Sequence, residues 1–312
     1  MAIKCRRFQG EQDYFKLREF LQESISVSGP KFYFNLNELE FGIDIVEGKS
    51  FLESITEELG NSFFWFEDDK LIGGIWPFNK IQLFINPKNK HLFNEMFKTA
   101  KEAVNEFIKE GSEDIGISDF NECSWCPFDG DTELEDVLIE NGYCKTDEYW
   151  VLRYFNYSEP VEEPRLPKGY YIKTLEELSD ISEVIHIYSQ CLGMDFNEQA
   201  LRNTRKFDTY RNELDIIVMG PEHTPVALCS GRYDEKNRMV SFEAVACFRE
   251  HRKKGISKAM MLYALKAARG LGAEVSTVLT LTPEQFPAPN RLYEAAGFKL
   301  VGNRYTWKKA SS

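Results

Sequence analysis

The chain has 312 residues, 43% of them hydrophobic, and a formal net charge of −12, which is enough for two hydrophobic cores of ordinary size. The acidic balance argues against a broad nucleic-acid-binding surface, because binding phosphates needs a basic face. No stretch approaches the ~20 apolar residues of a membrane-spanning helix and the N-terminus has no apolar run of signal-peptide length, so we expect a cytoplasmic protein that binds neither nucleic acid nor membrane.

The N-terminal half begins with a predicted strand over residues 3–8 and a predicted helix over residues 12–25. Residues 28–60 are mixed and fit either a pocket lining or irregular core. Alternation and helical spacing then predict three strands and a helix, over residues 63–66, 71–76, 81–85 and 92–108.

Cys123 and Cys126 form a CxxC pair, which can serve a redox function or supply half of a zinc site. A zinc site needs two further ligands, and the four histidines are scattered along the chain. The seven cysteines also lack the spacing of a disulfide framework. We predict ordinary reduced thiols and no metal, and keep a redox role for this pair as a lesser hypothesis.

The C-terminal half begins after residues 156–168, which are rich in Pro and Glu and have the composition of a linker. Strands are predicted over residues 170–174, 214–219, 226–233 and 304–307, and helices over residues 177–190 and 198–206.

The two halves share landmarks at an offset of about 155 residues. Gly142 and Gly297, each followed by an aromatic residue, lie 155 residues apart. Gly73 and Ala227, each in a predicted hairpin, lie 154 residues apart. The spacing indicates a duplicated domain.

The most informative stretch is residues 239–261. Alternation predicts a strand up to residue 248, and a polar loop with several cationic side chains, among them Arg252, Lys253 and Lys254, leads into a helix that begins near Ile256. Unpaired N–H groups at a helix start suit a phosphate, and Gly255 lets the backbone approach it. Neither GxxxxGK[ST] nor GxGxxG is present. A solvated basic helix start in a structural strand–helix unit is the alternative.

Arg252-x-x-Gly255-x-Ser257 after a strand resembles the Q/R-x-x-G-x-G/A loop of the GNAT superfamily of acyl-CoA-dependent N-acetyltransferases. The segment from Leu292 to Phe298, LYEAAGF, resembles the LYExxGF segment of the same family. The resemblance implies an α/β (α+β) fold of two tandem GNAT-like domains, each a mixed, mostly antiparallel sheet flanked by helices.

The domains implied are a degenerate GNAT-like domain over residues 1–155, a linker over 156–168 and a catalytic GNAT domain over 169–312. The first copy is interpreted as degenerate because its loop after residue 85, NPKNKH, contains no glycine. In addition, Leu138 stands where Tyr293 stands in the second copy.

The resemblance also implies acetyl-CoA as the acyl donor, and no metal. The strand backbone at Val245, Ala246 and Cys247 would hold the pantetheine arm. The loop would hold the diphosphate through Arg252, Lys253, Lys254, Gly255, Ile256, Ser257 and Lys258, where Ser257 departs from the usual Gly or Ala.

Asn290 is a further candidate contact for the cofactor, although it departs from the family pattern. Many members have an asparagine seven residues before the tyrosine, and that position here is Phe286. A simpler interpretation makes Asn290 the cap of the helix that carries Tyr293. Before it, Thr282 and Pro283 begin like a helix that Pro287 and Pro289 would break.

Tyr293 is the implied acid that protonates the departing CoA thiolate, and a phenol with a pKa near ~10 suits that role. The alternative is a half-buried aromatic side chain of an amphipathic helix. Glu243 is our candidate base, because the acceptor ammonium must lose a proton, and a water chain is the alternative. Glu243 lies two and four residues before Val245 and Cys247, so in a regular strand its side chain is predicted to project from the same face as theirs.

The function predicted is therefore an N-acetyltransferase in which a primary amine attacks acetyl-CoA directly in a ternary complex. An acyl-CoA-binding protein without catalysis is the alternative. The acceptor, a small molecule or a peptide, is expected to bind in a pocket assembled from distant segments such as residues 28–60 and 191–210. Neither its identity nor the oligomeric state follows from the sequence.

Overall fold

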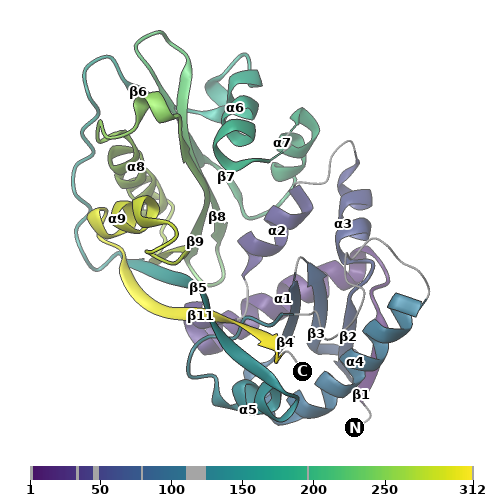
Figure 1. The fold of residues 1–312 in the computed structure, drawn as a ribbon. Helices are drawn as coiled ribbons and strands as arrows, with labels where there is room; N and C mark the ends of the chain where they lie inside the picture. Colours follow the sequence, from purple (N-terminus) through teal and green to yellow (C-terminus); the bar gives the residue numbers. More distant parts are fainter. Residues whose placement is uncertain are drawn as a thin grey trace. The chain divides into compact units, whose positions relative to one another are not determined.

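A computed structural model describes residues 3–32, 35–44, 49–78, 80–109, 124–194 and 197–310 (Figure 1). The chain forms two compact units. Unit 1 contains Met1–Asn35, Leu52–Val151 and Gly302–Ser312, and unit 2 contains Leu36–Phe51 and Leu152–Val301. Each unit therefore takes residues from both halves of the sequence, whereas the sequence predicted two continuous domains that meet at residues 156–168.

Unit 1 is built on a four-stranded antiparallel sheet in the order β1-β2-β3-β4. The strands are Ile3–Arg7, Phe63–Glu67, Lys70–Phe78 and Lys80–Ile85. The helices are α1 (Glu11–Ser28), α3 (Phe51–Leu59), α4 (Phe93–Lys109) and α5 (Thr132–Glu140). The predicted strands and the two predicted helices of this half are confirmed, and α3 and α5 were not predicted.

The second sheet has seven strands in the order β11-β5-β10-β9-β8-β7-β6, and all residues of β6 to β10 belong to unit 2. In chain order the strands are β5 (Tyr143–Asn156), β6 (Tyr171–Thr174), β7 (Tyr210–Met219), β8 (Pro225–Asp234), β9 (Met239–Cys247), β10 (Val275–Leu281) and β11 (Lys299–Lys309). Strands β6 to β9 pair antiparallel, and β9 pairs with β10 in parallel. The mixed, mostly antiparallel sheet confirms the predicted fold class, although β5 and β10 were not predicted as strands.

Helices cover both faces of this sheet. One face packs on α8 (Ile256–Gly270) and α9 (Pro287–Ala295), through side chains such as Phe242 and Met260. The other packs on α6 (Ser182–Ile187), the following turn η6 (Tyr188–Leu192) and α7 (Glu198–Thr204). The helix predicted over residues 177–190 begins only at Ser182, because a capping box from Thr174 to Glu177 closes an earlier, separate turn.

Helix α2 (Leu36–Asp44) comes from the N-terminal half of the sequence but belongs to unit 2. It contacts α7, β8 and β9. This helix lies in the stretch that the sequence left open between pocket lining and irregular core.

The predicted linker packs against unit 2. Tyr157, Val161 and Leu166 pack on the core that α8 covers, and the Glu162 carboxylate accepts a hydrogen bond from Lys258 on α8 at 2.7 Å. Its polar composition therefore reflects a segment with one buried side and a solvated acidic side, rather than a flexible connection.

The register of each unit confirms the duplication. Ile85, the last residue of β4, pairs with Gly73, and Cys247, the last residue of β9, pairs with Ala227. In both copies a helix then ends before a glycine with positive φ, +74° at Gly142 and +94° at Gly297, and a strand follows.

Glu58 in unit 1 is a strongly perturbed carboxyl group. The indole N–H of Trp76 donates a hydrogen bond to the carboxylate of Glu58 at 3.1 Å. Burial nevertheless raises the pKa of Glu58 from its usual 4.5 to about 7. The folded state therefore holds this proton more tightly than the unfolded chain does, and the stabilisation is lost as pH rises toward 7.

We expect Glu58→Gln to stabilise the protein by on the order of 2 kcal/mol at pH 8, because the amide removes the cost of a buried charge. Near pH 4.5 the variant and the wild type should be equally stable. Urea denaturation at the two pH values measures this difference. Glu102→Gln, at an exposed site on α4, is the control, and equal effects of both substitutions at pH 8 would contradict the assignment.

Candidate active site

Strands β9 and β10 separate part-way along their length. Their parallel pairing covers Met239, Val240 and Ser241 on β9, while β9 continues to Cys247 and β10 to Leu281. On its other side β9 stays paired with β8 up to Cys247. Beyond Ser241, β9 thus has an edge that faces the space left by β10, with main-chain groups that β10 does not use.

A β-bulge in β9 lies at this point. The register passes from Cys229↔Val245 to Gly231↔Phe242, so that Glu243 and Ala244 both oppose Ser230. Ala244 has φ 60°, a left-handed conformation that costs an alanine about 1–2 kcal/mol. Such a strained residue in the middle of a strand marks a functional site in many proteins.

The bulge reverses the parity of the strand. Before it, Val240 and Phe242 face the core under α8, and after it Val245 and Cys247 face that core. Ala244 and Ala246 face the opposite core. Glu243 lines a cavity beside Ala244, so the prediction that it shares a face with Val245 and Cys247 is wrong, because one extra residue shifts the alternation.

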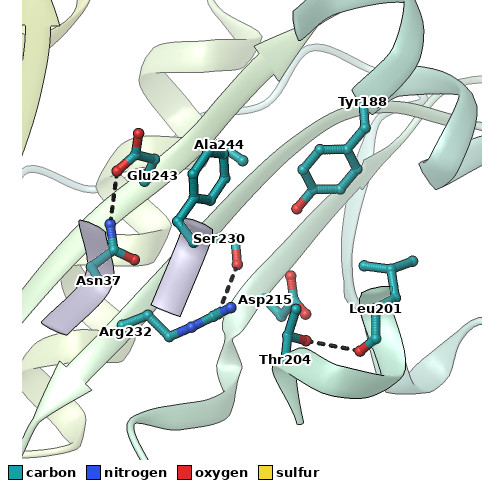
Figure 2. Close-up of a pocket in the computed structure, with 10 residues that line it drawn as sticks. Asn37, Tyr188, Leu201, Thr204, Asp215, Ser230, Arg232, Glu243 and Ala244 are labelled. Carbon is teal, nitrogen blue, oxygen red and sulfur yellow. Dashed lines mark hydrogen bonds between the residues drawn. The ribbon is translucent and has the colours of Figure 1, made fainter. Parts of the chain in front are cut away.

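Asn37 on α2 fixes the Glu243 side chain. Its Nδ2 donates a hydrogen bond to Oε2 of Glu243 at 3.0 Å, as Figure 2 shows. Asn37 itself is buried. Sequence analysis did not identify this residue, since it lies 206 positions from its partner and in no recognised motif.

The open edge of β9 exposes the main chain of two residues. The N–H of Phe248 donates to the carbonyl of Val226 on β8 at 3.0 Å, so in the antiparallel register Ala246 also points its main-chain groups at β8. Those of Val245 and Cys247 therefore point away from β8. Of the three strand residues predicted to hold the pantetheine arm, Ala246 is thus the one whose main-chain groups are already paired with β8.

The turn after β9 has an irregular backbone with two positive φ angles. Arg252 is extended, with φ −69° and ψ 163°, and its N–H donates to the carbonyl of Arg249 at 3.3 Å. Lys253 has φ 60°, and Gly255 has φ 80° just before α8 begins. Turns of this kind can direct N–H groups toward an anion. A Cβ on Gly255 would meet no atom within 4 Å, so the turn is open, and the predicted stretch from Lys253 to Lys258 includes the first turn of α8.

Three of the cationic side chains at the turn have local partners, among them Lys254, whose Nζ donates to the Tyr170 hydroxyl at 3.4 Å. Nε of Arg252 donates to the carbonyl of Cys247 at 2.9 Å and so ties the turn to the end of β9. Lys258 pairs with Glu162 at 2.7 Å. Lys253 and Lys254 are exposed, and a pocket of ≈ 630 Å³ lies beside the turn, lined by Arg249 and Arg252 among others.

Ile256 and Ser257 begin α8. Ile256 is buried and anchors the helix start in the core. The Ser257 hydroxyl contacts the Cys247 thiol, whose pKa is raised by burial. The serine that departs from the family pattern therefore has a partner within the protein.

Tyr293 lies on α9 and is 6% exposed, within the core under α8. Burial raises its pKa above the ordinary range, and the charges of Cys229 and Glu243 raise it further. The two predicted catalytic residues are thus close enough to interact electrostatically. The phenol remains protonated at physiological pH.

Asn290 is a structural residue rather than a helix cap. It is 2% exposed, and its Nδ2 donates to the carbonyls of Leu281 and Phe286 at 2.9 and 2.8 Å. Phe286 is the N-cap of α9, and Pro287 and Pro289 lie in the first turn, where a helix needs no N–H donor. The turn that begins at Thr282 thus ends before Pro287, and these prolines start a new helix, α9.

The equivalent turn of unit 1 is closed by its own atoms. The side chain of Asn86 accepts a hydrogen bond from the N–H of Lys88 at 3.0 Å, and its carbonyl accepts one from the N–H of Asn89 at 2.8 Å. Leu138, which replaces the tyrosine, is fully buried. The main-chain N–H groups of Lys88 and Asn89 are therefore already bonded and not available to an anion.

Cys126 is buried beside Thr306, which argues against an accessible redox pair, and Cys123 lies outside the described residues. Within the described ranges, no group of three or more His, Cys, Asp or Glu side chains is arranged to hold a metal ion. None of the described helices is both long and apolar enough to cross a membrane.

With this geometry established, the comparison with protein families is decisive for unit 2. Residues 181–298 match the Acetyltransferase (GNAT) family. The chain carries a GNAT acetyltransferase domain. The matched GNAT residues run from the start of α6 to the end of the segment after α9, and include β9, its bulge, the turn and Tyr293.

Solved structures show that the whole chain has a tandem GNAT fold. A GCN5-related N-acetyltransferase from Sphaerobacter thermophilus is 13% identical, with a TM-score of 0.64 over 98% of this chain and 94% of the other. The tandem GNAT protein from the clavulanic acid biosynthesis pathway is 12% identical, with a TM-score of 0.63 over 100% of both chains. A GNAT-family acetyltransferase from Colwellia psychrerythraea is 14% identical, with a TM-score of 0.56 over 97% and 98%. The comparison with curated proteins gives no match.

The backbone of the GNAT turn can be tested by a matched pair of substitutions. Lys253→Gly should leave stability unchanged or raise it, because glycine adopts positive φ without the strain of a lysine. Lys254→Gly should destabilise by about 0.5–1 kcal/mol through backbone entropy, in addition to the loss of its 3.4 Å hydrogen bond to the Tyr170 hydroxyl. Both remove one exposed positive charge, and equal changes in urea denaturation would contradict the turn geometry.

Proposed function

We propose that the protein is an N-acetyltransferase that moves an acetyl group from acetyl-CoA to a primary amine by direct attack in a ternary complex. The observation that carries the proposal is the coincidence of three features in unit 2. These are the unpaired edge of β9 after Ser241, the open turn before α8, and the electrostatic proximity of Glu243 and Tyr293.

The cofactor would lie along the open edge of β9 and over the start of α8. The main-chain groups of Val245 and Cys247 would pair with the amide groups of the pantetheine arm, as a neighbouring strand would. The N–H groups from Lys253 to Lys258 would hold the diphosphate at the positive end of the helix dipole. Asn290 is left out of this proposal, because both its N–H groups already bind main-chain carbonyls.

The reaction needs three proton transfers around one acyl transfer. The ammonium loses a proton to Glu243 or to a water next to it, and the nitrogen of the free amine then bonds to the thioester carbon. As the C–S bond breaks, that nitrogen releases a second proton to water. The oxyanion formed on the way would accept a hydrogen bond from the N–H of Val245. Tyr293 would donate a proton to the departing thiolate.

The buried environment of Tyr293 is compatible with this role. A phenol with a raised pKa is a weaker acid than in water, but burial also raises the pKa of the neighbouring Cys229 thiol. A thiolate that forms in the same surroundings is therefore a stronger base than in water. The difference in pKa between donor and acceptor, rather than either value, controls the transfer.

We assign the acetyl transfer to unit 2 alone. In unit 1 the turn after β4 is closed by Asn86, and Leu138 replaces the tyrosine. This copy is then a degenerate GNAT domain that does not bind acetyl-CoA.

Tyr293→Phe should lower kcat for acetyl transfer about 100-fold or more, because the general acid is lost. Acetyl-CoA binding should stay within a few-fold of the wild type. Release of the CoA thiol with a panel of amines, together with calorimetry, measures both. A wild-type protein that binds acetyl-CoA but acetylates no amine would instead favour an acyl-CoA-binding protein without catalysis.

Glu243→Gln should lower kcat/KM about 100-fold at pH 7 if the carboxylate takes the proton from the amine. The loss should shrink as pH approaches the amine pKa near ~10.4, because the amine then deprotonates in solution. A pH profile of wild type and variant tests this. Parallel profiles at all pH values would assign the proton to a water chain that does not depend on Glu243.

A further inference from the structure

Residues 157–166, which lie in the segment between β5 and β6 in Figure 1, form what we call the acidic strap. Its backbone is held on unit 2 at both ends. The hydroxyl of Tyr157 hydrogen-bonds to that of Ser276 on β10 at 2.7 Å, and Val161 and Leu166 pack on the core that α8 covers. The side chains between these contacts are therefore presented to unit 2 at set positions.

Each of the three glutamates of the acidic strap pairs with a lysine of unit 2. The pairs are Glu159 with Lys299, Glu162 with Lys258, and Glu163 with Lys266. Lys258 and Lys266 both lie on α8, eight residues apart, which is about 12 Å along the helix. One carboxylate of the strap therefore lies at the start of α8, and its neighbour lies towards the other end.

Lys258 is in the first turn of α8, among the residues whose N–H groups are proposed above to hold the diphosphate. Side chains of an α-helix tilt towards its N-terminus, so the ammonium group of Lys258 is directed to the same end of the helix. Its Nζ donates to Oε2 of Glu162 at 2.7 Å. The two side chains are 37% and 63% exposed, so solvent reaches both and the pair separates at little cost.

Two other cationic side chains of the turn bond to neutral groups. Arg252 donates to the carbonyl of Cys247 at 2.9 Å, and Lys254 donates to the hydroxyl of Tyr170 at 3.4 Å. Neither contact cancels a positive charge. The pairing of Lys258 with the strap does cancel one, and it places a carboxylate beside a site for a ligand with two negative phosphate groups, which this carboxylate repels.

We propose that Glu162 competes with the diphosphate of acetyl-CoA for Lys258 and so lowers the affinity of the protein for its acyl donor. The proposal rests on the acetyl transfer proposed above. In the free protein the ammonium group of Lys258 binds the carboxylate of the acidic strap. When acetyl-CoA binds, the ammonium group turns to the diphosphate and Glu162 is left to solvent. Glu162 is thus a positioning residue that acts through Lys258.

Glu162→Gln should tighten the binding of acetyl-CoA to the full chain at least about threefold in 0.1 M salt, because it frees Lys258 and removes a negative charge. Glu163→Gln is the matched control, since it breaks the neighbouring pair of the same strap. It should change the affinity less than about 1.5-fold, because its partner lies about 12 Å further along α8, beyond the Debye length at this salt concentration. Calorimetry measures both, and equal effects of the two substitutions would overturn the proposal.

A donor without phosphate groups separates this competition from a change in the shape of the site. S-acetyl pantetheine has the thioester and the pantetheine arm of acetyl-CoA but no diphosphate. Glu162→Gln should leave the affinity for this donor unchanged while it tightens the binding of acetyl-CoA, because the competition involves the phosphate charges. A similar gain for both donors would overturn the proposal.

Lys258→Gln tests whether Glu162 acts through the lysine. This substitution should weaken acetyl-CoA binding several-fold, because it removes a positive charge from the diphosphate site. In the Lys258→Gln background, the gain from Glu162→Gln should fall below about twofold, because no ammonium group remains to be freed. An equal gain in both backgrounds would show direct repulsion of the ligand and would overturn the competition for Lys258.

Turnover separates this inference from the proposed function. If Glu162→Gln binds acetyl-CoA more tightly than the wild type does but neither protein acetylates an amine, the competition stands and the proposed activity fails. If amines are acetylated, and the wild type, Glu162→Gln and Glu163→Gln bind acetyl-CoA equally, the activity stands and the competition fails. No binding of acetyl-CoA to any of the three would overturn both.

Discussion

The structure of this site depends on one strained position in β9. Ala244 adopts φ 60° at a bulge that places Glu243 and Ala244 opposite a single residue, Ser230. In the same region β9 and β10 stop pairing, with Ser241 and Thr277 as the last partners. A regular strand would remain paired on both sides and offer no main-chain groups to a ligand. Glu243 points toward Asn37 and the polar cavity, opposite to Phe242, and the bulge returns Val245 and Cys247 to the core under α8.

The two copies of the domain share their order of elements and differ at the turn. Both have a strand hairpin, a third strand, a turn and a long helix, and in both a glycine with positive φ follows the last helix. In unit 2 the turn has two positive φ angles and is open at Gly255. In unit 1 the side chain of Asn86 occupies the turn amide that an anion would need. Unit 2 in turn depends on the N-terminal half of the sequence, which provides α2.

The sequence was informative where the signal was local. The strand, basic turn and helix around Gly255 follow from alternation and helical spacing, and the duplication follows from the positions of Gly142 and Gly297. The face of Glu243 was predicted wrongly because a bulge adds one residue to the alternation without a glycine or proline to mark it. Residues 156–168 were interpreted as a linker because acidic residues and prolines dominate their composition. Two of their apolar side chains, Val161 and Leu166, nevertheless pack on the core. The role of Asn37 could not be predicted, since it depends on which strands and helices become neighbours in space.

The central claim is that one copy of the domain binds acetyl-CoA and the other does not. Calorimetric titration of the full chain with acetyl-CoA tests this most directly, because the stoichiometry counts sites without any need to know the acceptor. The account predicts one molecule bound per chain. Two molecules per chain would contradict the assignment of unit 1 as degenerate, and no binding at all would contradict the role of β9 and its turn.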